Sequence, residues 1–547
     1  MTREDIRQVI RLWAEAAVRA QKAGFDGVEL VGSAGYLISQ FLSPLTNRRT
    51  DEYGGSMEKR FRFPLELIRT VRQAVGENYP LFLRVSGNDF VPGGNTNDEA
   101  VLFCQAAETA GIDLFNVTGG WHETKVPQLP GEVPRGQYAY LAAAIKRAVK
   151  VPVVVCNRIH TPELAELMLA LERGDLVGVA RPLIADPDWC VKAARGCPED
   201  IRPCMSCNQG CLAKTFFGQP VECLVNGRAG REYLRPTRTQ SVERERVLIV
   251  GGGPGGCESA LQLAARGDEV TLMEAADDIG GQLPLVAAPP GKEEFERLRK
   301  YYKVQLKKLG VRVLTGHRAA RDEISAGDYD RIVIATGSKP KTLTLPAADS
   351  SITVCLAQEI LSGETVAGRR VVILGGGSVG CETANYLARQ GSLNDAQVSF
   401  LMRCRAESDE KIHALLDHSD RMISIVDMDE VGKGFAPGTA WPVLSELKRL
   451  GVKQYPHARI VTMHANTVSI RQATQSGPEG EERREITLPC DMLVVAVGSE
   501  PERGLYEALA GQGRPVHLVG DAGGVGKISD AVRQACALAD ETGPCTT

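Results

Sequence analysis

The stretch C-M-S-C-N-Q-G-C-L-A-K-T-F-F-G-Q-P-V-E-C (residues 204–223) has cysteines at the spacing C-x2-C-x3-C, followed after eleven residues by a fourth. Three closely spaced cysteines completed by a distant fourth are typical of sites that hold a [4Fe–4S] cluster. Structural zinc sites more often show two matched pairs. The spacing therefore favours iron–sulfur over zinc, with disulfide pairing as a third alternative. The predicted metal ligands are Cys204, Cys207, Cys211 and Cys223.

The composition of the chain is that of a globular protein with several domains. It has 547 residues, 43% of them hydrophobic, and 64 basic residues nearly balance 68 acidic ones, for a net charge of −4. This balance argues against a nucleic-acid partner or a membrane-surface patch. No apolar run approaches the roughly 20 residues that cross a bilayer, and the N-terminus lacks the apolar region of a signal peptide. We expect a cytoplasmic protein.

Upstream of the cysteines, short β-branched runs alternate with stretches of helical periodicity. A helix is expected over residues 5–22, with Thr2 as its N-cap. Strands are expected at 28–31, 81–85, 114–118, 151–156 and 176–180, and further helices at 63–75, 97–110, 138–149 and 162–172. This alternation predicts an α/β fold with parallel strands and crossover helices.

Several polar side chains lie at or just after the predicted strand ends, where an α/β barrel builds its site. They are Tyr36, Arg84, His122, Arg158 and Arg181.

Residues 28–56, V-E-L-V-G-S-A-G-Y-L-I-S-Q-F-L-S-P-L-T-N-R-R-T-D-E-Y-G-G-S, resemble the flavin-binding barrel of the Old Yellow Enzyme superfamily. Further similarity lies in G-G-W-H-E (119–123), C-N-R-I (156–159), V-A-R-P (179–182) and the cysteine motif. Together they are most similar to the multidomain branch that contains 2,4-dienoyl-CoA reductase and clostridial enoate reductases. Single-domain members carry H-G-A-H-G-Y, where this chain has Val31 and Ala34 and keeps Tyr36.

The resemblance implies that the N-terminal region is a partial TIM-type β/α barrel that binds FMN and substrate. In this family a flavin delivers hydride to an activated alkene while a positioned acid protonates the neighbouring carbon. Tyrosine is a weak acid and needs a cationic or hydrogen-bonding neighbour for this task. By resemblance, Tyr36 is the proton donor and His122 its partner. The implied FMN contacts are Arg84, Arg158, Ala180 and Arg181.

The number of strands before the cysteines is smaller than a closed barrel requires. A barrel of this type has eight strand–helix units, whereas five strand candidates precede residue 204. The family resemblance also begins inside the barrel. We expect either an N-terminally truncated gene product or a barrel completed by a partner chain.

Downstream of the cysteines, a first glycine-rich fingerprint follows the predicted strand 246–250. The sequence G-G-G-P-G-G (251–256) leads into a helix, and Glu274 closes a second strand at 269–273. Such glycines allow a tight turn and close approach to a pyrophosphate, while the acid bonds a ribose hydroxyl. The motifs A-T-G (335–337) and V-G-D-A (519–522) resemble other contacts of FAD-binding proteins. The predicted FAD contacts are Gly251, Gly253, Gly256, Glu274, Gly281, Gln282 and Asp521.

A second fingerprint, G-G-G-S-V-G (375–380), follows the strand 371–374 and resembles the NAD(P)H-binding insertion of disulfide-reductase-like proteins. Its predicted contacts are Gly375, Gly377 and Gly380. Two segments compete as the strand that selects the nicotinamide. A strand at 398–401 followed by Arg403 and Arg405 would favour NADPH, whereas a strand at 423–426 followed by Asp427 would favour NADH. We favour Asp427 and NADH, with 391–421 as a charged surface insertion.

These patterns predict a domain order and a flow of electrons. The expected domains are 1–200 (barrel, FMN and substrate), 201–235 (cluster), 236–343 (FAD), 344–500 (NAD(P)H) and 501–547 (return to the FAD domain), with a polar linker at 235–241. By resemblance, electrons pass from NAD(P)H through FAD, the cluster and FMN to a C=C bond, for example in an enoyl or dienoyl thioester. The alternatives are an amine dehydrogenase-like flavoprotein, or a diaphorase that transfers electrons without substrate chemistry of its own.

Overall fold

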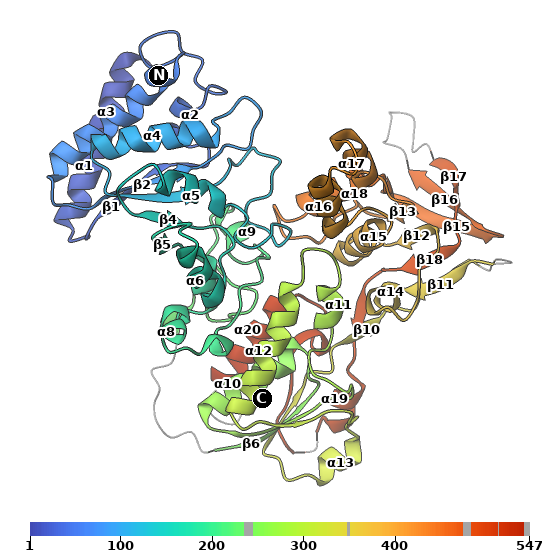
Figure 1. Ribbon diagram of the computed structural model, residues 1–547. Helices are drawn as coiled ribbons and strands as arrows, with labels where there is room; N and C mark the ends of the chain where they lie inside the picture. Colours follow the sequence, from blue (N-terminus) through green and yellow to red (C-terminus); the bar gives the residue numbers. More distant parts are fainter. Residues whose placement is uncertain (235–243, 347–350, 474–482, 512, 541–547) are drawn as a thin grey trace. The chain divides into compact units, whose positions relative to one another are not determined.

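The computed structural model describes residues 1–234, 244–346, 351–473, 483–511 and 513–540 (Figure 1). These residues belong to two compact units: 1–183 with 193–198, and 184–192 with 199–547. The predicted linker 235–241 lies outside the described residues. None of the described helices is both long enough and apolar enough to cross a lipid bilayer.

The first unit is built on a parallel sheet whose strands follow one another in chain order, β1-β2-β3-β4-β5. This is the arrangement of consecutive β/α units, and β1 and β5 are the outer strands of the described sheet. The strands are β1 (Val28–Gly32), β2 (Leu81–Ser86), β3 (Leu114–Thr118), β4 (Val153–Val155) and β5 (Leu176–Val177).

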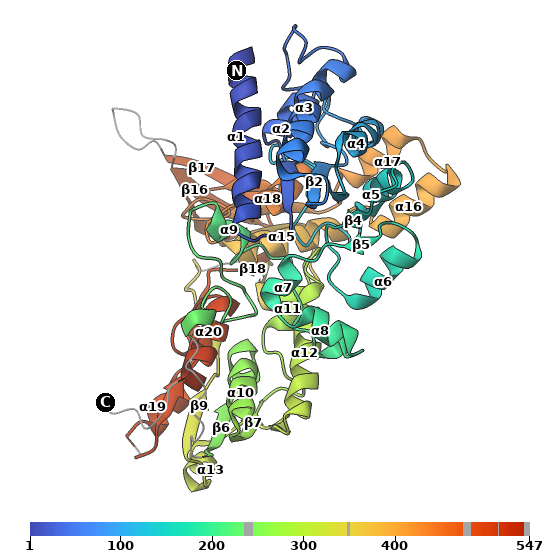
Figure 2. The same ribbon diagram turned by 90° about the vertical axis from the view of Figure 1, so that its left-hand side faces the viewer.

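Helices cover one face of this sheet. Figures 1 and 2 show α1, α3 and α4 close together, and α3 packs against both of the other two. Because strand side chains alternate between faces, Leu83 and Phe115 are buried beneath the helices, whereas Arg84 and Asn116 lie on the other face. The helices of the first unit are α1 (Arg3–Lys22), α2 (Leu37–Leu42), α3 (Met57–Val75), α4 (Asn97–Ala110), α5 (Ala139–Lys146) and α6 (Pro162–Ala170). Two short helices, α7 (Arg181–Ala185) and α8 (Trp189–Ala194), lie where the chain passes between the two units.

The helix starts follow local capping chemistry. Thr2 caps α1 as predicted: its side chain accepts from the backbone N–H of Asp5, whose carboxylate bonds the backbone N–H of Thr2. Thr96 and Glu99 form the same reciprocal pair at α4. Each pair satisfies two backbone donors that the first helical turn leaves free.

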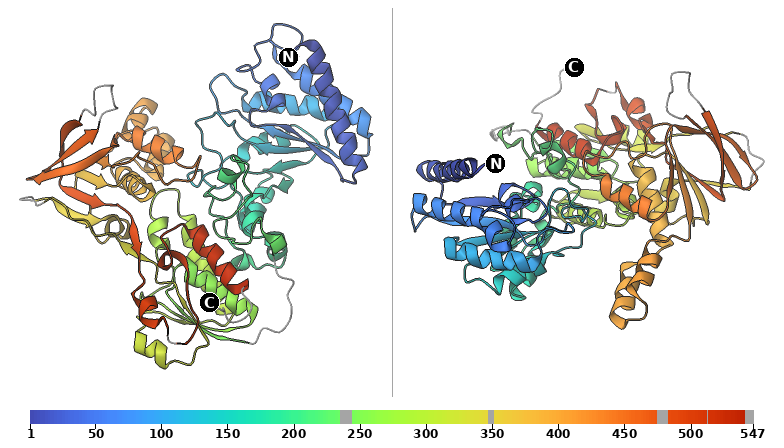
Figure 3. Two further views of the ribbon diagram at one scale, coloured as in Figure 1. Left: turned by 180° about the vertical axis from the view of Figure 1, so that it is seen from behind. Right: turned by 90° about the horizontal axis from the view of Figure 1, so that it is seen from above.

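The second unit contains two parallel sheets, and the sequence that forms the second sheet is inserted between strands of the first. The first has the order β20-β9-β6-β7-β8, so its last strand returns after the whole second sheet. Helix α20 packs against α10 beside it (Figure 3). The elements are β6 (Arg246–Val250), α10 (Pro254–Arg266), β7 (Glu269–Met273), α11 (Leu283–Ala287), α12 (Glu294–Lys308), β8 (Arg312–Leu314), α13 (Arg321–Ala326), β9 (Arg331–Ile334), α19 (Gly504–Leu509), β20 (Val516–Leu518) and α20 (Ile528–Asp540).

The second parallel sheet has the order β11-β18-β12-β13-β14, and an antiparallel sheet of β15, β16 and β17 follows β14. The short strands β10 (Ser338–Pro340) and β19 (Ser499–Pro501) pair with each other where the chain passes between the two parallel sheets. The elements are β11 (Thr353–Leu356), α14 (Ala357–Ser362), β12 (Arg370–Leu374), α15 (Ser378–Gln390), α16 (Asp395–Cys404), α17 (Asp409–Leu416), β13 (Met422–Val426), α18 (Trp441–Arg449), β14 (Lys453–Tyr455), β15 (Ala458–His464), β16 (Thr467–Ala473), β17 (Arg483–Pro489) and β18 (Met492–Val495).

The strand considered at 398–401 is wrong, because these residues lie within helix α16. Asn394 begins this helix by accepting from the backbone N–H of Gln397, whose side chain bonds the Asn394 backbone in return. The strand that pairs with β12 is β13, and Asp427 follows it directly. Arg403 and Arg405 therefore do not end the second strand of this sheet.

Candidate functional site

Tyr36 and His122 meet at the edge of the first sheet. Tyr36 lies in the loop after β1 and His122 in the loop after β3, and the carboxyl ends of parallel strands share one edge. The Tyr36 Oη and His122 Nε2 atoms are 3.3 Å apart, and the two rings meet edge to face at 79°. Both side chains are exposed. The structure thus brings the two predicted catalytic residues together.

Arg84 lies on the face of the sheet that the helices leave uncovered. Its Nε is 3.1 Å from Glu29 Oε1, and Asn116 donates to Glu29 Oε2 at 2.9 Å. Arg84 pairs in register with Asn116, so the three side chains form a polar row across β1, β2 and β3. Sequence reasoning missed Glu29 and Asn116, although the period-two alternation of a strand places both on the same face as Arg84.

Arg158 and Arg181, predicted to bind FMN, both reach the segment 129–133 that follows β3. Buried Arg158 donates to the carbonyls of Val133 at 2.8 Å and Gly131 at 3.0 Å. Arg181, which follows exposed Ala180, donates to the carbonyl of Leu129 at 2.5 Å. Guanidinium groups also bind phosphate well, so a phosphate at this position would compete with these carbonyls for the same donors.

The four predicted metal ligands lie on one short segment around α9 (Leu212–Thr215). Burial raises the pKa of the Cys207 thiol, and the Cys204, Cys223 and Cys211 thiols add to the increase. Gly210 packs on the backbone of Glu222 so closely that a Cβ would lie 2.6 Å from its carbonyl oxygen. This contact brings the fourth cysteine back to the first three. A four-thiolate cluster fits this donor set.

The first glycine loop has the geometry that a dinucleotide requires. A Cβ at Gly251 would lie 2.3 Å from the Ala335 carbonyl oxygen, and one at Gly256 would lie 1.8 Å from the Gly251 carbonyl oxygen. Gly253 instead has only Gly281 near it, at 4.0 Å, so its side of the loop stays open. Glu274 Oε2 accepts from the backbone N–H of Gly252 at 2.6 Å. FAD fits this loop, because its pyrophosphate needs such a close backbone approach.

The second glycine loop repeats this geometry in detail. A Cβ at Gly375 would lie 2.4 Å from the Ala496 carbonyl oxygen, and one at Gly380 would lie 1.8 Å from the Gly375 carbonyl oxygen. Gly377 is again the least crowded of the three, since a Cβ there would make only an ordinary contact of 3.6 Å with the Lys433 carbonyl oxygen. The Asp427 carboxylate accepts from the backbone N–H of Gly376, as Glu274 does at the first loop. Asp427 thus has the position at which an acid meets the ribose of a nicotinamide nucleotide.

A further polar cluster joins three segments of the FAD region. Ser338 donates to Asp521 Oδ2 at 2.8 Å, and Gln282 donates to Ser338 Oγ at 3.4 Å. Asp521 also accepts from the backbone N–H of Gly526. The predicted contacts Gln282 and Asp521 are therefore linked through Ser338, which no sequence motif indicated.

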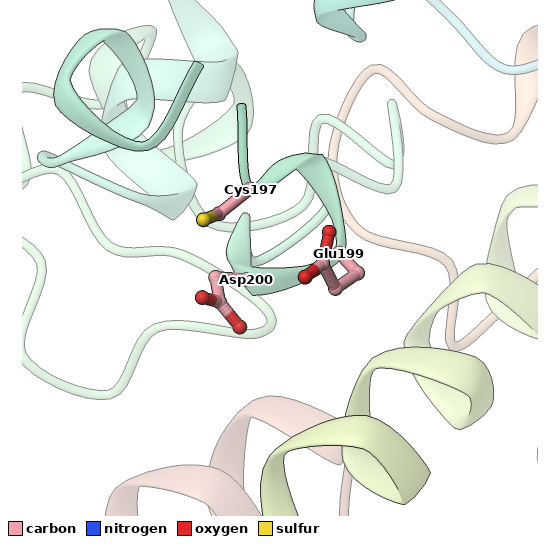
Figure 4. Close-up of side chains that lie close together, drawn as sticks. All are labelled: Cys197, Glu199 and Asp200. Carbon is pink, nitrogen blue, oxygen red and sulfur yellow. The ribbon is translucent and has the colours of Figure 1, made fainter. Parts of the chain in front are cut away.

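Figure 4 shows Glu199 and Asp200 on the short turn η1 (Pro198–Asp200), which follows Cys197 in the chain. Lys308 of α12 bonds both carboxylates, at 2.9 Å to Glu199 and 2.7 Å to Asp200. Gln305 adds a bond to Asp200 at 2.7 Å. The two acids therefore attach this turn to the last turn of α12.

Comparison with known proteins matches both halves of the chain. Residues 1–200 match the NADH:flavin oxidoreductase / NADH oxidase family, and residues 245–513 match the pyridine nucleotide-disulphide oxidoreductase family. A metal reductase of Desulforamulus reducens is 44% identical over 98% of this chain and 79% of its own length. An NADH oxidase of Thermoanaerobacter brockii is 37% identical over 97% of this chain and 77% of its own.

A solved structure of 2-naphthoyl-CoA reductase in complex with 2-naphthoyl-CoA shares the fold, with a TM-score of 0.86. The two sequences are 32% identical, and the matched region covers 99% of this chain and 77% of the reductase chain.

The fold and these loops define a flavin-dependent NAD(P)H oxidoreductase with FMN-binding and FAD-binding parts. The chain belongs to the NADH:flavin oxidoreductase / NADH oxidase family, within the multidomain branch of the Old Yellow Enzyme superfamily that contains 2,4-dienoyl-CoA reductase.

Proposed function

We propose that this chain reduces a C=C bond conjugated to a carbonyl or thioester group, with NADH as the electron donor. The observation that carries the proposal is the contact of Tyr36 Oη with His122 Nε2, 3.3 Å apart at the edge of the first sheet. Similarity to a 2-naphthoyl-CoA reductase over nearly the whole chain also supports an unsaturated acyl thioester as the substrate class.

The reaction consumes one NADH and one proton, and it converts the C=C bond to CH–CH. When bound, the flavins and the cluster supply hydride and single-electron transfer. Tyr36 supplies the proton: its Oη–H bond breaks as a C–H bond forms at the carbon next to the carbonyl. His122 holds the Tyr36 Oη atom by hydrogen bonding and stabilises the oxygen as its proton leaves.

The remaining assignments complete the proposal. The domain boundaries are those expected from the sequence: 1–200, 201–235, 236–343, 344–500 and 501–547. Arg84, Arg158 and Arg181 serve FMN, the glycine loop at 251–256 with Glu274 serves FAD, and the loop at 375–380 with Asp427 serves NADH. Two features of each glycine loop support this assignment. The third glycine of each loop, Gly253 or Gly377, has the most space around it. The backbone N–H of the glycine before it donates to the acid, Glu274 or Asp427.

The test is NADH-dependent reduction of cinnamoyl-CoA by anaerobically purified protein. Tyr36→Phe is expected to lower kcat by about 10²–10⁴-fold, the usual contribution of a general acid. NADH-dependent reduction of a dye should be unchanged, because it does not need the proton donor. Tyr140→Phe, at an exposed position of α5, is the matched control. Full activity of Tyr36→Phe would contradict the assignment of the proton donor.

A diaphorase without substrate chemistry is the second candidate, because the second unit contains both dinucleotide-binding sheets and the cysteine segment. It predicts dye reduction by NADH, with FAD but no FMN in the purified protein. An amine dehydrogenase would instead take electrons from its substrate and pass them to an external acceptor. The acid Asp427 beside a complete second glycine loop favours a nicotinamide donor over that alternative.

We also propose that a partner chain adds strands to the first sheet. Among the described residues, β1 and β5 are the outer strands of this sheet, and the edge of an outer strand can pair with a strand of another chain. Mass measurement of the native protein by light scattering tests this: a single polypeptide species of 59.0 kDa would contradict it.

A further inference from the structure

We propose that Ser86 is a positioning residue that holds the Tyr36 loop and the His122 loop in register. Ser86 is the last residue of β2 and is only 5% exposed. Its Oγ accepts from the backbone N–H of Ala34 at 3.1 Å and donates to the backbone carbonyl of Gly120 at 3.1 Å. The inference rests on the proposed roles of Tyr36 and His122.

The two backbone groups that Ser86 joins lie at the same sequence separation from the two proposed catalytic residues. Ala34 lies two residues before Tyr36, and Gly120 lies two residues before His122. The backbones also meet directly, since Ala34 and Trp121 form an isolated parallel bridge. The Ser86 hydroxyl, on the strand between the two loops, therefore binds each loop two residues before its proposed catalytic side chain.

The two loops do not depend on Ser86 equally. The His122 loop has further bonds to the loop after β2, because Gly120 N–H donates to the Asn88 carbonyl and Gly87 N–H donates to the Thr118 carbonyl, both at 2.7 Å. Ala34 has a left-handed backbone with φ of 58°, a conformation that a non-glycine residue keeps only when its surroundings impose it. Loss of the Ser86 hydroxyl should therefore release the Tyr36 loop first.

This release would act on the proton donor. At 3.3 Å, the contact between Tyr36 Oη and His122 Nε2 is at the long end of a hydrogen bond. A shift of the Tyr36 loop by about 1 Å would break it. Substrate binding would change little, since Ser86 is buried beneath the loops.

The experiment compares Ser86→Ala with Ser86→Thr, which keeps the hydroxyl. Ser86 lines a small cavity together with Gly32 and Ser39, so the site is not fully packed around this side chain. In NADH-dependent cinnamoyl-CoA reduction, Ser86→Ala should lower kcat by about 10²-fold with KM nearly unchanged, the usual effect of a misplacement near 1 Å. Ser86→Thr should recover kcat to within about threefold of the wild type.

Thr70→Val is the matched control. Its hydroxyl also donates to a backbone carbonyl, that of Glu66, but within the single helix α3. It should leave kcat unchanged. FMN content and NADH-dependent dye reduction should be the same in all variants, which separates positioning from loss of cofactor.

The outcomes separate this inference from the proposed function. Full kcat in Ser86→Ala, together with a low kcat in Tyr36→Phe, overturns the role of Ser86 alone. Full kcat in both Tyr36→Phe and His122→Asn overturns the proposed function. If Ser86→Ala fails to fold, Ser86→Cys replaces it: its weaker hydrogen bonds should place kcat below that of Ser86→Thr, and equal kcat values would overturn the inference.

Discussion

Arg202 and Glu258 form a buried, bidentate ion pair that joins the cysteine segment to the first dinucleotide-binding helix. The Nη1–Oε2 and Nη2–Oε1 distances are 2.7 and 3.0 Å. Arg202 stands two residues before Cys204 and also donates to the carbonyl of Val225. Burial alone would lower the pKa of Arg202, but the Glu258 carboxylate raises it well above its ordinary value. Both ends of the cysteine segment are thereby attached to α10.

Replacing Glu258 should destabilise the second unit and loosen the cysteine segment. Glu258→Ala leaves the Arg202 charge buried without its partner, which costs about 3–5 kcal/mol. We expect a lower urea midpoint by circular dichroism and earlier release of iron. Glu485→Ala breaks a surface pair with Arg471 at 3.9 Å and is the control. Equal midpoints for the two variants would contradict a structural role for the buried pair.

Cys211→Ser should abolish the metal centre. The wild-type protein, purified without oxygen, should contain about four iron and four acid-labile sulfide per chain, and the variant should contain almost none. Cys197→Ser, outside the predicted ligand set, should retain both. Zinc in place of iron in the wild type would show that the cluster prediction is wrong.

Asp427 should set the choice of nicotinamide. Its carboxylate accepts from the backbone N–H of Gly376 and would repel a 2′-phosphate. We expect faster turnover with NADH than with NADPH. Asp427→Asn should lower the ratio of the NADH rate to the NADPH rate by about tenfold, equivalent to about 1.4 kcal/mol. Glu274→Gln, the equivalent change at the first loop, should lower FAD content without altering the ratio. A wild-type preference for NADPH would refute the assignment.

Arg158 should control retention of FMN. If a phosphate takes the place of the carbonyls of Gly131 and Val133, FMN binding must rearrange the segment 129–133. We expect hydrogen exchange in this segment to change when FMN is added, and Arg158→Met to lower FMN content while FAD is kept. Arg62→Met, which breaks an exposed pair with Glu66, is the control. Unchanged exchange would contradict this mode of binding.

The stability of the first unit should depend on pH through Asp51. A hydrogen bond from Arg49 lowers the pKa of Asp51 to about 2. Because the folded-state pKa lies below the unfolded value of about 3.9, the stabilisation is complete above about pH 5 and disappears as the pH falls toward 2. The difference in urea midpoint between the wild type and Asp51→Asn should therefore shrink below pH 4. In an Arg49→Gln background this pH dependence should disappear.

Local patterns predicted most of the elements. The helix 97–110 and the strand 114–118 have the predicted bounds, because a capping box and a glycine mark the helix ends and a short run of mostly apolar residues marks the strand. The strand proposed at 398–401 is a helix instead. Its apolar residues fit either structure, and only the Asn394 cap and the absence of a neighbouring strand among the described residues distinguish them.

The sequence alone determined the type of each site. Cysteine spacing, glycine loops and acids at strand ends are local signals, since each depends on a backbone conformation formed by a few consecutive residues. Only the tertiary structure decided which side chains meet. Tyr36 and His122 are 86 residues apart in the chain, and Arg202 and Glu258 are 56 apart. Their contacts depend on strand order and helix packing, and the burial of a charge depends on neighbours that no local pattern specifies.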